Sequence, residues 1–192
     1  MEGCITLETD RLILRQWKQE DWPLFAAINS DPVVMKYFPN PLSETESNTI
    51  ADKIHALITE QGWGFWAVEE KLSGLFTGFV GLNKVLPVLP FYPAIEIGWH
   101  LARSSWGQGY ATEAANTVLK FAFDKLNVDE VCSFASVNNT RSIAVMQRLN
   151  MVNTQQNFEH PVIPAGNLLR EHVLYKLTRG QWQSTKINWN RK

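Results

Sequence analysis

Apolar positions recur along the chain with two periods, which predict strands and helices in alternation. Strand-like apolar runs bounded by turn residues fall at 7–16, 64–69, 76–82, 94–102, 130–137, 151–160 and 170–177. Helical spacing of apolar residues, at i, i+3, i+4 and i+7, falls at 21–29, 43–60, 109–126 and 140–149. This order predicts an α/β fold, with a mixed central sheet of about seven strands flanked by helices.

Two details of this pattern bear on later arguments. Ser43 and Glu46 have the spacing of a capping box, and Asp21 stands where an N-cap is expected, with Pro23 in the following turn. In the predicted strand 94–102, alternation places Glu96, Gly98 and His100 on one face. The residues between them, which are mostly apolar, occupy the other face.

Composition is typical of a soluble cytoplasmic domain of ordinary size. The chain has 192 residues, is 45% apolar and carries a net charge of −1, which argues against disorder and against a dedicated nucleic-acid binder. Cys4 and Cys132 are far apart, and without a CxxC motif they indicate neither a disulfide framework nor a metal site. The charged N-terminus and the proline-rich run 85–95 predict no signal peptide and no membrane span. We expect one domain over residues 1–178, followed by a polar, loosely held tail over 179–192.

One segment carries chemistry, the run SSWGQGYAT at residues 104–112, between a predicted strand and a predicted helix. Gly107 and Gly109 let the backbone turn tightly, so that amide groups converge at the helix N-terminus and favour a phosphate or pyrophosphate. A P-loop would need GxxxxGK[ST], which is absent, and the third glycine position of a dinucleotide fingerprint is Thr112. Both of those nucleotide sites are therefore disfavoured.

The segment WGQGYATEA resembles the acetyl-CoA loop of the GNAT N-acetyltransferases, and most closely the branch that contains ribosomal-protein N-terminal acetyltransferases. Three further stretches are similar to that branch: ETDRLILRQWKQEDW near the N-terminus, NNTRS at 138–142 and QRLNM at 147–151. The resemblance covers roughly residues 5–178. It implies a mostly antiparallel sheet and transfer of an acetyl group from acetyl-CoA, with no metal, to a primary amine in a ternary complex.

The resemblance also implies roles for individual residues. Three parts of the chain would hold the coenzyme. Its pyrophosphate would be bound by the loop of Gly107, Gln108, Gly109, Tyr110, Ala111 and Thr112. Its pantetheine arm would be contacted by backbone groups of Trp99, His100 and Leu101 in the predicted strand 94–102, and by Asn139. Asn139 is equally suited to cap the following helix. Ser142 would donate to the leaving thiolate, with a plain structural serine as the alternative. Met146 stands where some relatives have a tyrosine that protonates this thiolate, so that general acid is missing at this position.

Glu96 is the candidate base, since partial burial of a carboxylate on a central strand raises its pKa. A salt-bridged structural acid is the alternative. We expect neither cysteine to lie near this site, which gives no support to an acyl-enzyme route. His100 lies roughly 13 Å from Glu96 along an extended strand, so we expect a packed histidine rather than a partner in proton transfer. Arg11 and Arg15 are expected to be structural ion partners. Met35, Tyr37 and Phe38, with Trp22 nearby, could line an acceptor pocket or belong to the core.

The acceptor is either a protein N-terminal α-amine or a small free amine such as an antibiotic, polyamine or amino acid. We expect no membrane or nucleic-acid partner, and a monomer or homodimer. Two rival functions remain open at this level: a non-catalytic acyl-CoA-binding sensor, and a nucleotide-binding regulator that uses the same helix end.

Overall fold

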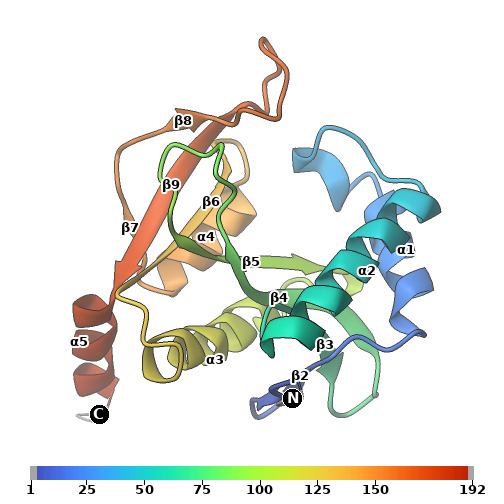
Figure 1. Ribbon diagram of the computed structural model, residues 1–192, viewed down its shortest axis with the longest axis horizontal. Helices are drawn as coiled ribbons and strands as arrows, with labels where there is room; N and C mark the ends of the chain where they lie inside the picture. The colour runs from blue at the N-terminus through green and yellow to red at the C-terminus, as the bar shows by residue number, and fades with distance from the viewer. Residues whose placement is uncertain (1–3, 190–192) are drawn as a thin grey trace. The chain divides into compact units, whose positions relative to one another are not determined.

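In a computed structural model of the protein, residues 4–189 are described, with side chains described as far as Ser184 (Figure 1). The elements follow the order β1 (Leu7–Glu8), β2 (Leu12–Arg15), α1 (Asp21–Ser30), η1 (Met35–Tyr37), α2 (Glu44–Gln61), β3 (Phe65–Glu70), β4 (Phe76–Lys84), β5 (Ile95–Leu101), η2 (Arg103–Ser105), α3 (Tyr110–Asp124), β6 (Glu130–Ser136), α4 (Thr140–Arg148), β7 (Val152–Asn153), β8 (Phe158–Glu159), β9 (Glu171–Thr178) and α5 (Arg179–Trp189).

The strands form a mixed sheet in the order β1-β2-β3-β4-β5-β6-β9-β7, with β8 paired to β9. Strand β6 runs parallel to β5, whereas its pairing with β9 and the pairings of β1, β2 and β3 are antiparallel. The predicted α/β class and the mostly antiparallel sheet are therefore confirmed. No helix among residues 4–189 is long and apolar enough to cross a membrane.

Within the described chain the sheet has nine strands rather than about seven, because two predicted strands are each broken in two. Residues 7–16 form a hairpin of β1 and β2, in which Leu7 is opposite Leu14 and the amide of Thr9 bonds the Leu12 carbonyl. Residues 151–160 contain β7 and β8, separated by a bend where Gln155 has a φ of +60°. Polar turn residues interrupt both runs, and their turn chemistry outweighs the strand propensity of their neighbours.

The chain divides into two compact units, residues 1–83 with 98–118 and residues 84–97 with 119–192, of which residues 1–3 and 190–192 lie outside the described part. The core of the first unit is aromatic. Trp17 packs edge-on against Phe25 with ring centroids 5.0 Å apart, and both are buried beside residues of α2 such as Ile54 and Ile58. Burial of these large rings supplies the main driving force for docking α1 and α2 on the sheet.

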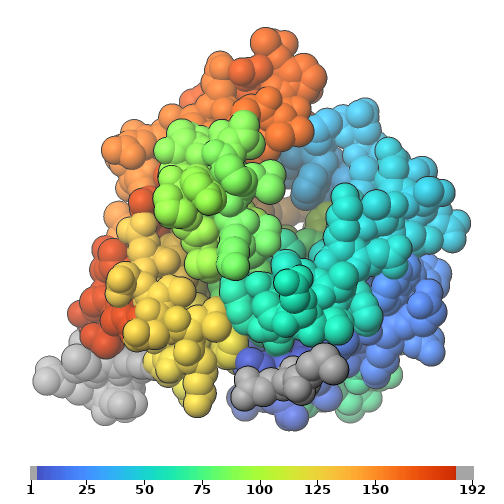
Figure 2. Space-filling model, in the orientation of Figure 1, coloured from blue at the N-terminus to red at the C-terminus, as the bar shows by residue number. Residues whose placement is uncertain are grey.

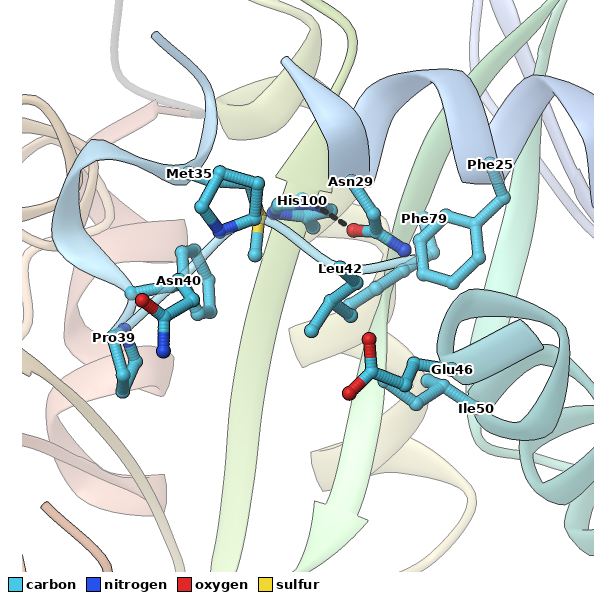
Figure 3. Close-up of a pocket in the computed structure, with 12 residues that line it drawn as sticks. Phe25, Asn29, Met35, Pro39, Asn40, Leu42, Glu46, Ile50, Phe79 and His100 are labelled. Carbon is cyan, nitrogen blue, oxygen red and sulfur yellow. Dashed lines mark hydrogen bonds between the residues drawn. The ribbon is translucent and has the colours of Figure 1, made fainter. Parts of the chain in front are cut away.

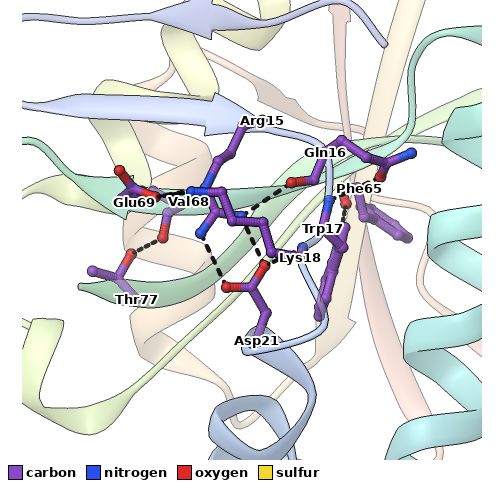
Figure 4. Close-up of polar contacts among 9 residues, drawn as sticks. All are labelled: Arg15, Gln16, Trp17, Lys18, Asp21, Phe65, Val68, Glu69 and Thr77. Atoms are coloured by element: carbon purple, nitrogen blue, oxygen red, sulfur yellow. Dashed lines mark hydrogen bonds and ion pairs between the residues drawn. The ribbon is translucent and has the colours of Figure 1, made fainter. Parts of the chain in front are cut away.

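A buried ion network joins β2, α1 and β3 in the same unit (Figure 4). Arg15 donates to both carboxylate oxygens of Asp21, at 2.7 and 3.0 Å, and to Glu69 at 2.6 Å. The side chains of Arg15 and Asp21 are only 12% and 3% exposed. The expected ion-pair role of Arg15 is confirmed. Asp21 does not cap α1 as predicted, since its carboxylate is used by Arg15 and by the amide of Lys18.

The predicted capping box of α2 is present, because the Ser43 hydroxyl accepts from the Glu46 amide while the Glu46 carboxylate accepts from the Ser43 amide. The predicted apolar face of α3 is also confirmed. Ala114, Ala115 and Val118 are fully buried in the first unit. Their small side chains let the helix approach the sheet closely.

The core of the second unit lies around β6 and β9. Cys132 and Leu174 are buried there, and a group of rings from Phe91, Phe134 and Phe158 packs beside them with centroids 5.1–5.8 Å apart. These contacts bury one face of the pair formed by β6 and β9.

The expected loose tail is wrong for the first part of residues 179–192, which forms helix α5. Trp182 is 8% exposed and stacks on Phe123, with ring centroids 5.7 Å apart. Arg179 donates to the carbonyls of Phe123 and Val128 at 2.8 and 2.6 Å. One aromatic side chain and one guanidinium are thus sufficient to dock a segment whose overall composition is polar.

Candidate active site

A tight turn leads from η2 into α3 in the first unit. Gly107 and Gly109 have φ angles of +76° and +82°, in the left-handed region that glycine adopts without steric cost. A Cβ on Gly107 would meet no atom within 4 Å, so the turn needs glycine for its backbone angles and not for space. The Gly109 carbonyl accepts the first helical bond, from the Glu113 amide at 3.0 Å. The amides of the first turn have no partner within the helix, and this end of α3 suits an anion.

Arg11 of the β1–β2 hairpin holds this turn in place. Its guanidinium donates to the Gln108 carbonyl at 3.0 Å through Nη2 and to the Glu113 carboxylate at 2.7 Å through Nε. The same group lies over the Tyr110 ring, 4.7 Å from the centroid. The expected ion-pair role of Arg11 is confirmed, and the contact with Gln108 adds a direct link to the glycine turn.

Charges around the start of α3 are balanced by hydrogen bonds. Burial alone would raise the pKa of Glu113, but hydrogen bonds from Thr9 and Arg11 hold it below the ordinary value. The Tyr110 hydroxyl donates to Glu70, which raises the pKa of Tyr110. Tyr110 is 5% exposed, so it offers a ligand only its backbone.

The last residues of β5 lie close to β4. A Cβ on Gly78 would stand 2.1 Å from the His100 carbonyl oxygen, so only glycine allows this approach. The Leu101 carbonyl accepts from the Trp106 indole at 2.9 Å. Trp106 thereby ties the glycine turn back to the strand that precedes it.

His100 is a packed histidine, as predicted. It is 9% exposed, and its Nε2 lies 2.8 Å from Asn29 Oδ1. The rings of Phe38 and Phe79 lie 5.3 and 5.7 Å from the imidazole. Burial lowers the pKa of His100 to about 4, so the ring is neutral at physiological pH.

His100 also lines a pocket of about 380 Å³ in the first unit (Figure 3). The other lining residues come from α1, the 31–43 loop, α2 and β4, and are Phe25, Asn29, Met35, Phe38, Pro39, Asn40, Pro41, Leu42, Glu46, Ile50 and Phe79. Of the side chains expected to line an acceptor pocket, Met35 and Phe38 do so. Trp22 belongs to the core instead, with its indole N–H donating to Asp52 at 2.9 Å.

Glu96 lies at the start of β5 in the second unit, in parallel register with Cys132 of β6. The expectation that neither cysteine lies near the predicted site is therefore wrong for Cys132. Burial, and secondarily the Glu96 charge, raise the pKa of the Cys132 thiol to about 12. The thiol stays protonated at neutral pH and is unsuited to act as a nucleophile, which agrees with direct attack by the amine.

Asn139 caps α4, with its Oδ1 accepting from the Ser142 amide at 3.1 Å. The capping role is thus confirmed, and the role in coenzyme binding stays a prediction. Ser142 follows in the first turn of α4, while Met146 is fully buried in the core. Among residues 4–184, no group of three or more His, Cys, Asp or Glu side chains is placed to hold a metal ion.

Sequence reasoning missed the polar end of the pocket. Asn29 and His100 are 71 positions apart, and Ser47 bonds Asn29 from a third element. Nothing in the local sequence signals that these side chains meet. The prolines at positions 39 and 41, beside Phe38, were the one available sign of a shaped apolar loop.

A mixed sheet flanked by helices, with a clamped glycine turn at the start of α3 that suits an anion, is the architecture of this chain. The family model of the acetyltransferase (GNAT) domain matches residues 11–152. Since that match spans most of the chain, the protein belongs to the GNAT acetyltransferase family.

Individual proteins agree with this assignment. The chain is 26% identical over 179 residues to the uncharacterized N-acetyltransferase YnaD of Bacillus subtilis, covering 92% of this chain and 98% of that protein. It is 29% identical over 188 residues to the FsC-acetyl coenzyme A-N(2)-transacetylase of Aspergillus fumigatus, covering 92% and 77%. The solved ribosomal-protein-S5-alanine acetyltransferase from Vibrio fischeri shares the fold, with a TM-score of 0.72, 17% identity and coverage of 93% and 98%.

Proposed function

We propose that the protein transfers the acetyl group of acetyl-CoA to the nitrogen of a primary amine, by direct attack within a ternary complex. The observation that carries this proposal is the glycine turn before α3. Gly107 and Gly109 are left-handed, and Arg11 fastens the intervening carbonyl. The amides of residues 107–112 would bind the diphosphate, as preorganised donors at a helix N-terminus.

The chain's own groups would serve the remaining demands of acyl transfer. Backbone groups of Trp99, His100 and Leu101 would contact the pantetheine arm, and one of their amides would donate to the oxyanion, an effect of about 3 kcal/mol in comparable sites. Asn139 would use its amide nitrogen for the same arm while its oxygen caps α4.

Proton transfer would be handled by Glu96 and Ser142. The amine must lose a proton before its lone pair attacks the thioester carbon, and Glu96 would accept that proton through water. As the C–N bond forms and the C–S bond breaks, Ser142 would donate to the departing thiolate. The protonated state of Cys132 beside Glu96 keeps that thiol out of the reaction.

The acceptor class has two candidates, a protein N-terminal α-amine and a small free amine. The fold shared with a ribosomal-protein acetyltransferase supports the first, and the likeness to a transacetylase of FsC supports the second. Both share a primary amine as the nucleophile. We propose one catalytic domain over residues 1–178 for either acceptor.

A matched pair of glycine variants tests the coenzyme site. Gly109 and Gly166 have nearly equal φ angles, +82° and +80°, and neither would crowd an added Cβ. Valine at either position imposes similar backbone strain, so the stability cost is comparable. We expect G109V to abolish acetyl-CoA binding in calorimetry and G166V to retain it.

The same calorimetry decides between the enzyme and its rivals. Tighter binding of ATP or NAD than of acetyl-CoA would contradict the proposal in favour of a nucleotide-binding regulator. Acetyl-CoA binding without thiol release for any amine in a broad screen would favour the non-catalytic sensor. Equal acetyl-CoA affinity in G109V and the unmodified protein would remove the assignment of the loop.

A further inference from the structure

We propose that the pocket of the first unit binds the uncharged, aromatic end of the acceptor, and that His100 recognises a neutral hydrogen-bond donor on that ring. The acceptor would then be an aromatic primary amine, either free or as the first residue of a peptide. This inference rests on the proposed function for the chemistry at the amine, whereas the pocket itself is independent of it.

The walls of the pocket are suited to an aromatic group. Phe25, Phe38 and Phe79 contribute three rings, and Met35 adds an adaptable apolar side chain (Figure 3). The volume of about 380 Å³ falls in the range of pockets for small organic ligands. Phe38, one of these rings, is 45% exposed, and its centroid lies 5.3 Å from the His100 imidazole.

The polar end of the pocket is preorganised. Asn29 donates through Nδ2 to the hydroxyl of Ser47 at 2.9 Å, which turns Oδ1 toward His100 Nε2 at 2.8 Å. All three residues are buried. Because Oδ1 can only accept, the proton of the neutral imidazole resides on Nε2, and Nδ1 carries a lone pair. The structure gives Nδ1 no hydrogen-bond partner among the described residues, so it can accept a hydrogen bond from a ligand.

Charge determines which end of the acceptor enters. Glu46 is the one charged residue among the described lining residues, and it is exposed at the N-terminus of α2, a helix that lies on the molecular surface (Figure 2). Hydrogen bonds from Ser43 keep the pKa of Glu46 low, so its carboxylate stays ionised. The inner end has only the neutral imidazole and the Asn29 amide. An ammonium group therefore finds no anion beside the His100 imidazole, and the amine of an acceptor in this pocket lies outside the inner end.

This arrangement separates the acceptor classes that the sequence left open. A polyamine or an aminoglycoside would carry a second ammonium group into the uncharged inner end, where no anion is available. An aromatic amine with a phenol or indole donor leaves its ammonium outside and satisfies Nδ1 with an uncharged group. The pocket therefore selects by excluding charge as well as by contact.

Binding to the intact protein without coenzyme provides the test. The probes are tyramine, O-methyltyramine and spermidine, monitored by calorimetry. We expect tyramine to bind, O-methyltyramine to bind about five- to tenfold more weakly because it lacks the donor, and spermidine not to bind. Equal affinity for tyramine and O-methyltyramine, or preferential binding of spermidine, would overturn the proposal.

Two surface variants control for folding, because truncating His100 to alanine would leave the buried Oδ1 of Asn29 without its donor. Phe38→Ala removes a pocket wall that is 45% exposed, and Leu24→Ala removes a side chain on α1 that is 46% exposed and does not line the pocket. We expect F38A to weaken tyramine binding at least fivefold and L24A to leave it unchanged. Equal effects of the two variants would contradict the assignment.

Transfer assays distinguish the sources of the amine and separate this inference from the proposed function. Tyramine and a peptide that begins with tyrosine both satisfy the pocket, and the better substrate by kcat/KM identifies the source. If tyramine binds as expected but no amine is acetylated, the proposed function fails and the pocket assignment stands. If amines are acetylated and F38A alters KM for none of them, the pocket assignment fails and the enzyme remains.

Discussion

The buried imidazole of His100 gives the protein a pH-dependent stability whose size can be worked out from the structure. Burial lowers the pKa of His100 to about 4, against an ordinary value of about 6.5 for an exposed histidine. Between these values the unfolded chain binds a proton at this residue and the folded chain does not. The contribution of the neutral His100 to the free energy of unfolding is therefore fully present above the pKa of the unfolded chain, and it is lost as the pH falls toward 4.

The magnitude follows from about 1.4 kcal/mol for each pKa unit. The total loss approaches about 3 kcal/mol at pH 4, and about 2 kcal/mol of it is present by pH 5. The variant His100→Gln is neutral at every pH, and its side-chain amide can still donate to Asn29 Oδ1. The other three histidines are common to both proteins, so their titration cancels in the comparison.

Urea unfolding followed by tryptophan fluorescence at pH 7.5, 6.5, 5.5 and 5.0 measures this difference. We expect the free energy of unfolding of the unmodified protein to fall by about 2 kcal/mol more than that of H100Q between pH 7.5 and pH 5.0. Parallel curves, which differ by less than about 0.5 kcal/mol over this range, would refute the claim that His100 is neutral because it is buried.

Further outcomes are expected at other positions. Glu96→Gln should lower kcat by about a hundredfold or more, and Ser142→Ala by a smaller factor, while acetyl-CoA affinity is retained; unchanged turnover in both would remove the proton-transfer roles. Cys132, with a pKa of about 12, should resist alkylation by iodoacetamide at pH 8 in the folded protein, as mass spectrometry can check. Asp21→Ala should destabilise the fold by about 3–5 kcal/mol, since it leaves the buried guanidinium of Arg15 with one fewer anion; a loss under about 1 kcal/mol in urea unfolding would contradict this account.

Local patterns predicted the elements that are long and periodic. The helix of residues 109–126 and the strands predicted at 64–69, 76–82 and 94–102 follow from apolar spacing. An amphipathic face has a fixed period that the residues of the element itself display. The capping box at Ser43 is equally local, and so is the left-handed backbone conformation that requires glycine at positions 107 and 109. Each depends on residues within one turn. The glycine turn that we propose as the coenzyme site could be located from the sequence for this reason.

Short strands and docked polar segments were decided by distant contacts. The hairpin of β1 and β2 and the pair β7 and β8 exist because a neighbouring strand offers hydrogen bonds, which the isolated segments do not display. Helix α5 docks through Trp182 onto Phe123, a contact that composition alone did not reveal.

The acceptor pocket lies furthest from what sequence alone can show. Its polar end requires Asn29 of α1, Ser47 of α2 and His100 of β5 to meet, and each is an unremarkable residue within its own element. The protonation state of His100 depends on the rings that exclude water around it, and those rings come from three segments. The sequence by itself determined which backbone could bind a coenzyme, because that property is local. Only the tertiary structure decided what lines the pocket proposed for the acceptor, because burial and hydrogen-bond partners are properties of the assembled fold.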